Sequence, residues 1–149
     1  MKRQIEDYLR ARGVPYFRGH HDDEYFFLVD LLAGASRGRL NVHVEVCAAE
    51  PDALLVTISP DRYYPAEKAA LLGALADRWN AGAPAVRAVV HGSCDPLLVG
   101  VQARGHHRPA DAAGLSAFVD AAVAAGIDLF GQLAGTATEA SSPALRDAG

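Results

Sequence analysis

The stretch that most constrains the fold is residues 39–47, RLNVHVEVC, in which apolar and polar side chains alternate without a break. Neighbouring side chains of an extended strand point to opposite faces, so Leu40, Val42, Val44 and Val46 share one face of a strand. The residues between them are polar or small. A strand with one apolar face and one polar face is typical of an antiparallel sheet that is covered on one side only.

Further strands and helices are indicated on both sides of this stretch. Four other segments have the composition of strands: residues 24–32, 53–59, 85–91 and 97–104. Three segments have helical spacing: residues 1–12, residues 65–80, and a helix from near Pro109 to Leu133 with a candidate kink at Gly126. We therefore predict an α+β domain over residues 1–134, in the order α-β-β-β-α-β-β-α, with a five-stranded, mainly antiparallel sheet flanked by helices. Residues 135–149 are small and polar, which predicts a disordered tail.

Charge and cysteine content exclude several classes of function. The 14 basic and 18 acidic residues are mixed along the chain and give a net charge of −4, whereas nucleic-acid binders concentrate basic residues on one face. No run reaches the roughly 18 continuous apolar residues of a membrane span. Cys47 and Cys94 have no ligand spacing, which predicts reduced thiols. We expect a cytoplasmic protein that binds neither nucleic acid nor membrane.

The sequence RGHHDDEYFF at residues 18–27 is the first candidate for a metal site. Adjacent side chains in an extended chain point in opposite directions, so at most two of the four histidines and aspartates can face one ion. We predict a solvated loop and no metal or other cofactor. The alternative is a small metal-assisted hydrolase, which would use these residues: His20, His21, Asp22 and Asp23, with His106 or His107.

The polar face of the alternating strand is the second candidate. Asn41, His43 and Glu45 share this face, and side chains two residues apart on a strand are close enough to form an acid–base pair. Over an acid–base pair, we favour a polar surface that either faces solvent or is covered by a partner. On the helix over residues 65–80, Trp79 ends the apolar stripe, and Asn80 tolerates the left-handed conformation that closes a helix.

The element order, together with LLGALADRWNAGAPAVRAVVHGSCDPLLVGVQAR at residues 71–104, resembles the YbjN family, which is grouped with type III secretion chaperone-like domains. The matching parts are the helix end with Leu75, Trp79 and Asn80, and the two strands over residues 86–91 and 97–104. The resemblance implies a curved antiparallel sheet flanked by helices. It also implies a domain that binds peptides or partner proteins, often as a dimer, and that has no established enzymatic residues.

Together these observations predict a non-catalytic peptide- or protein-binding domain, chaperone-like or regulatory, that forms a homodimer. The predicted partner surface comprises Asn41, His43, Glu45 and Trp79. A homodimeric regulator without a ligand is the remaining alternative.

Overall fold

The computed structural model describes residues 1–33 and 36–140. Within these residues, three α-helices and one short 3₁₀ helix accompany seven strands in one sheet. The helices are α1 (Lys2–Arg12), η1 (Ala66–Lys68), α2 (Ala69–Ala81) and α3 (Ala112–Ala140). The strands are β1 (Tyr16–Arg18), β2 (Glu24–Ala33), β3 (Ser36–Cys47), β4 (Glu50–Pro60), β5 (Tyr64–Pro65), β6 (Arg87–Gly92) and β7 (Leu98–His107).

The predicted α+β class and the order of the main elements are confirmed. All strand pairs are antiparallel, and the order across the sheet is β1-β2-β3-β4-β7-β5, with β6 also paired to β7. Two short strands, β1 and β5, were not predicted, because segments of two or three residues show no periodicity in a sequence. Both lie at the ends of the sheet order.

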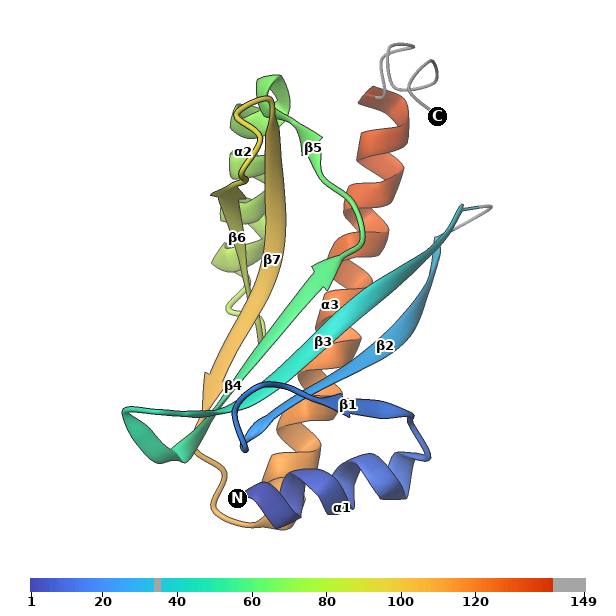
Figure 1. Cartoon of the computed structure of the whole chain (residues 1–149). Coiled ribbons are helices and arrows are strands. Elements are labelled where there is room, and N and C mark those ends of the chain that lie inside the picture. The colour runs from blue at the N-terminus through green and yellow to red at the C-terminus, as the bar shows by residue number, and fades with distance from the viewer. Residues whose placement is uncertain (34–35, 141–149) are drawn as a thin grey trace.

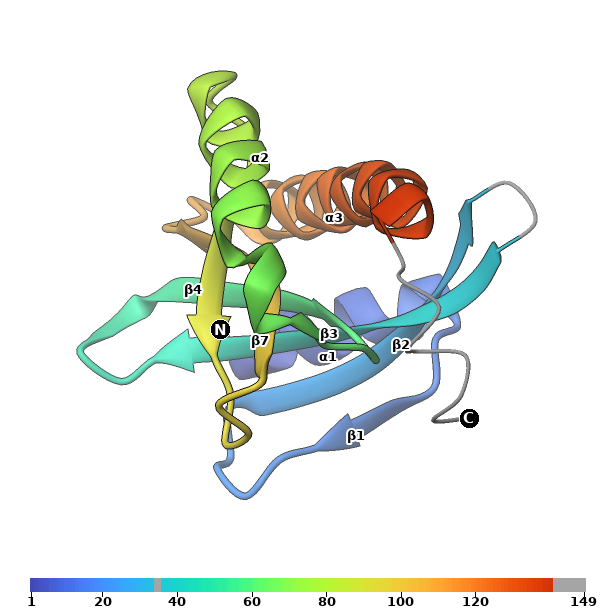
Figure 2. The same cartoon turned by 90° about the horizontal axis from the view of Figure 1, so that it is seen from above.

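The sheet has one covered face, as the alternation in β3 predicts. Side chains of its inner face form the core with residues from all three helices, and Figure 2 shows α2 and α3 on the same side of the sheet. In Figure 1, α3 runs behind the strands for most of their length, while α1 lies across the base. The opposite face, called the outer face below, carries no helix among the described residues.

Helix α3 continues without interruption through Gly126, the candidate kink position. A Cβ atom at Gly126 would lie 2.7 Å from Ile58 Cδ1 and 3.1 Å from Ile58 Cγ2. The glycine therefore lets the helix approach β4 closely. The helix also extends to Ala140, past residue 134, where we expected the tail to begin. Residues 141–149 lie outside the described part of the chain, so their predicted disorder stays a prediction.

Of the described helices, α3 alone is long and apolar enough to cross a membrane. A stretch of 18 residues within Ala112–Ala134 has a mean hydropathy of 1.6, and 33% of this stretch is buried in the fold. A helix that packs in the core of a folded domain meets the same criteria, so this finding is weak evidence for a membrane span.

Two polar clusters attach α1 to the rest of the fold. The Tyr8 hydroxyl donates a hydrogen bond to Asp120 on α3, and Arg12 forms an ion pair with the same carboxylate. Burial, followed by the neighbouring Asp120, raises the pKa of Tyr8 to about 12. On the sheet side, the Tyr25 hydroxyl donates to Glu6 at 2.8 Å, and this hydrogen bond is the main reason why the pKa of Glu6 is lowered.

Candidate functional site

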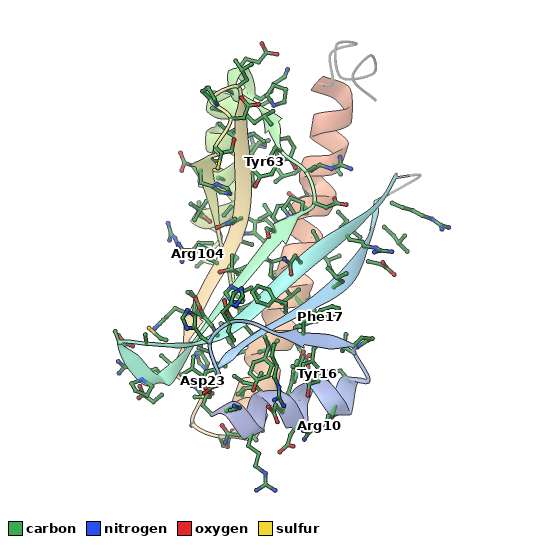
Figure 3. The ribbon with its side chains drawn as sticks, in the orientation of Figure 1. Arg10, Tyr16, Phe17, Asp23, Tyr63 and Arg104 are labelled. Atoms are coloured by element: carbon green, nitrogen blue, oxygen red, sulfur yellow. The ribbon has the colours of Figure 1, made fainter. Side chains whose placement is uncertain are left out.

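The outer face exposes a row of large apolar side chains along β1 and β2. Phe17 is 67% exposed, Leu28 49% and Leu32 70%. Phe17 lies directly opposite Phe26 on the neighbouring strand, and Figure 3 shows it on β1, in front of the other strands. Large apolar side chains on an uncovered sheet face make this surface a candidate for an interaction site.

The same region contains an open sheet edge. Strand β1 pairs with residues 25–27 of β2 only, whereas β3 pairs with β2 from Glu24 to Ala33. Among the described residues, therefore, residues 28–32 have a strand neighbour on one side alone. We call this segment the free edge. An edge strand presents unpaired backbone N–H and C=O groups to any extended chain that approaches it.

The edge strand β6 is covered by helix α2. The Asn80 amide donates to the backbone oxygen of Ala88 at 2.9 Å and accepts from the backbone N–H of Ala88 at 2.8 Å. The Trp79 indole N–H donates to the backbone oxygen of Val86 at 3.2 Å. These contacts occupy backbone groups of β6 and of the residue before it, so α2 protects this edge from pairing with another chain.

The role that we expected for Asn80 in closing the helix is wrong. Among the described residues other than glycine, Ala83 has the positive φ, 48°, and Asn80 lies within α2. Asn80 and Ala88 are eight residues apart, and no local pattern in the sequence predicts that they are in contact.

Of the four predicted partner-contacting residues, three lie together and one lies apart. Asn41, His43 and Glu45 stand on the outer face of β3, where Asn41 is exposed and the other two are half-buried. Trp79 is on α2, among the helices, and lines an open groove of about 480 Å³ between α2 and α3 together with Leu75, Leu129 and Leu133. The prediction that these residues contact a partner remains a prediction.

His43 stands between two carboxylates, one of which the sequence analysis did not single out. Its Nε2 atom lies 2.8 Å from Glu24 Oε1 and 3.9 Å from Glu45 Oε2. The ring is stacked on Phe26, with centroids 4.3 Å apart and planes at 5°. Glu24 reaches this position because it pairs directly with Glu45 across β2 and β3, a register that the sequence alone does not reveal. We call Glu24, His43 and Glu45 the Glu–His–Glu cluster.

The two histidine pairs of the hydrolase alternative do not converge. His106 lies on the outer face, with Nε2 3.3 Å from Glu50 Oε2, whereas His107 stacks on Phe118 of α3 on the inner face. The strand order places β7 three strands away from β2, about 14 Å at the usual strand spacing. His21, Asp22 and Asp23 instead line a hollow of about 450 Å³ beside Glu24 and Glu45. Asp23 is labelled in Figure 3, at the lower end of the sheet.

The acid beside His106 belongs to a surface ion pair. Arg108 contacts Glu50 at 2.7 Å, and this hydrogen bond is the main reason why the pKa of Glu50 is lowered. His106 thus shares its only close carboxylate, among the described residues, with a permanent cation. No comparable cation lies next to the Glu–His–Glu cluster among the ion pairs of the described residues.

Comparison with solved structures finds a similar fold. The crystal structure of YbjN from E. coli, a protein proposed to be a transcription regulator, superposes with a TM-score of 0.67 over 90% of this chain and 91% of that chain. The chain has the fold of YbjN. The resemblance seen in residues 71–104 is therefore confirmed at the level of the fold. Sequence identity is 10%, so the likeness extends to the fold alone. No family model matches the chain, and no curated protein matches it.

Proposed function

We propose that this domain is a non-catalytic protein-binding module that takes up an extended segment of a partner protein as an additional strand along the free edge of β2. The observation that carries the proposal is the free edge itself: within the described part of the chain, residues 28–32 lack a second strand neighbour, and the leucines at both ends are exposed. Strand addition is a recurrent mode of peptide recognition, in which backbone hydrogen bonds supply affinity and alternate side chains supply specificity.

The side chains of the free edge define the chemistry of the partner. Leu28, Asp30 and Leu32 all project to the outer face, because residues two apart on a strand share a face. Asp30 lies opposite Arg39 on β3 but forms no ion pair with it in the described structure. An added strand with a basic residue between two apolar residues would match this order.

The position of Asp30 supports a different protein as the occupant over a second copy of the chain. In a two-fold antiparallel pair centred on Asp30, this carboxylate would face its own copy, and like charges directly opposite each other are destabilising. The comparison also supports a binding role, since a transcription regulator, as YbjN is proposed to be, acts through its contacts with other molecules. The homodimer predicted from the sequence would then use another surface, such as the groove between α2 and α3.

Site-specific photo-crosslinking tests the proposal in cells of the natural host. A benzophenone amino acid at position 32 should give a discrete crosslinked species with another protein. The same group at position 97 should not, although Leu97 is as exposed, at 74%, on the turn before β7. The variant Leu28→Lys should abolish the adduct at position 32, because lysine on an edge strand opposes pairing with a further strand.

Matched variants separate binding from folding. Leu28→Lys and Leu97→Lys both replace an exposed leucine, so their thermal unfolding should agree closely while only the first loses the adduct. A band of twice the chain mass at position 32 would identify a second copy as the occupant and contradict the heteromeric assignment. Equal adducts at positions 32 and 97 would mean that the free edge is not the binding site.

A further inference from the structure

We propose that Glu24, His43 and Glu45 form a binding site for a first-row divalent transition-metal ion such as Zn²⁺, at the end of the outer face where β2 begins. This site is separate from the free edge and does not depend on the proposed function. The potential ligand atoms of the three side chains all lie within 4.8 Å of one another.

The distances within the cluster suit a shared cation. Zinc binds imidazole nitrogen and carboxylate oxygen at about 2.0–2.2 Å, which separates neighbouring ligand atoms by about 3.0–3.5 Å. The two distances from His43 Nε2, 2.8 Å to Glu24 and 3.9 Å to Glu45, lie on either side of that range. Rotations of the two glutamate side chains, without movement of the backbone, would bring all three atoms to one ion.

Among the described residues, the Nε2 atom of His43 lacks a partner that a metal ion could supply. This atom is buried and has no hydrogen-bond partner in the described structure, although Glu24 Oε1 lies only 2.8 Å away. The contact is close enough for an ion pair but is not aligned as a hydrogen bond. A metal ion bound by the Nε2 lone pair and by the carboxylate would supply the partner that this atom lacks in the described structure.

The two carboxylates also favour a cation at this point. Glu24 and Glu45 are a directly opposed pair on antiparallel strands, an arrangement that is destabilising for like charges. A divalent cation between them would neutralise both carboxylates.

The scaffold holds the ligands in place and gives an ion access. Two paired strands carry all three residues, and Phe26 stacks on His43, which fixes the plane of the imidazole ring. Ligands on regular elements with packed supporting side chains are held more precisely than ligands on loops. The hollow lined by His21, Asp22 and Asp23 borders Glu24 and Glu45, so an ion can enter from solvent through an acidic mouth.

The ligand set defines the class of metal. One imidazole and two carboxylates suit zinc, manganese, iron or cobalt, whereas magnesium and calcium prefer oxygen ligands alone. Three protein ligands leave at least one coordination position for water or for a group supplied by another molecule.

Calorimetric titration of untagged, chelator-treated protein with ZnCl₂ tests the proposal. We expect one ion per chain, and binding at least about tenfold weaker in His43→Gln and in Glu45→Gln, as expected when part of a metal site is removed. Glu45 is partly exposed, so Glu45→Gln should fold normally even if His43→Gln does not. Titration with MgCl₂ should show no comparable binding.

The pair His106 and Glu50 provides a matched control, because it is also a histidine–glutamate contact on the outer face, with atoms 3.3 Å apart. His106→Gln should leave zinc affinity unchanged. Loss of binding in His106→Gln, or in His20→Gln/His21→Gln, together with full binding in Glu45→Gln would overturn the assignment. Absence of one-to-one zinc binding by the wild-type protein would also overturn it.

Discussion

Replacing Asn80 with alanine tests whether the contact between α2 and the edge of β6 is important for stability. The substitution removes both hydrogen bonds to the backbone of Ala88, at 2.8 and 2.9 Å. Each bond contributes about 1 kcal/mol net to the free energy of unfolding. Alanine is the better helix former by about 0.5 kcal/mol. The Ala88 side chain is 5% exposed, so water reaches its freed backbone groups poorly and a further fraction of a kcal/mol is lost. The expected net loss is about 2 kcal/mol.

Urea denaturation measures this loss, with Trp79, the only tryptophan, as the fluorescent reporter on the same helix. Amide exchange at Ala88 should accelerate in the variant, since its N–H loses its acceptor. Asp77→Ala is the control: the residue is exposed on α2, so the variant changes helix propensity without removing an edge contact. If Asn80→Ala unfolds within about 0.5 kcal/mol of the wild type, the edge contact does not stabilise the fold as the structure implies.

Two further predictions concern close packing and pH. Gly126→Ala and Gly131→Ala gain the same helix propensity, about 1 kcal/mol, but only the first places a Cβ 2.7 Å from Ile58, while position 131 has open space. Overpacking costs about 1–3 kcal/mol. Thermal or urea unfolding should therefore show that Gly131→Ala is more stable than the wild type and that Gly126→Ala is less stable than Gly131→Ala by about this amount. Equal stabilities of the two variants would contradict the close approach of α3 to β4. The pKa of Tyr8 is raised to about 12 from 10, so between these pH values the unfolded chain loses a proton that the folded chain keeps, and stability falls as pH rises. We expect the free energy of unfolding to fall by about 1–2 kcal/mol between pH 10 and pH 12 after solvent screening, and to fall less in Tyr8→Phe. Urea titrations at several pH values measure this fall. Equal pH dependence in the two proteins would show that Tyr8 does not titrate in this way.

Much of the fold could be predicted from local patterns. The alternation in residues 39–47 reappears as β3, with Leu40, Val42 and Val44 fully buried. The main helices were found from the spacing of their apolar residues, and α1 ends before Gly13, which adopts the left-handed conformation. The short strands β1 and β5 could not be found, because their pairing with β2 and β7 is decided by tertiary contacts.

The candidate sites were less predictable. The polar face of β3 was identified, but neither Glu24 as the neighbour of His43 nor the open edge of β2 was. Both depend on register: Glu24 meets Glu45 because of the pairing of β2 with β3, and residues 28–32 are free because β1 begins only at Tyr16, which pairs with Phe27. The acidic loop at residues 20–23 gave a signal for metal binding, yet the residues that meet in space come mainly from the strands that follow it.

The sequence by itself determined which residues are extended or helical and which face of each element is buried, because side-chain periodicity acts within a few residues. It also determined the class of the fold. Only the tertiary structure decided which strand edges are covered, since Asn80 and Ala88 meet across two different elements. In the same way it decided that a histidine and two glutamates meet at one point, because register is set by the packing of whole strands and leaves no local trace in the chain.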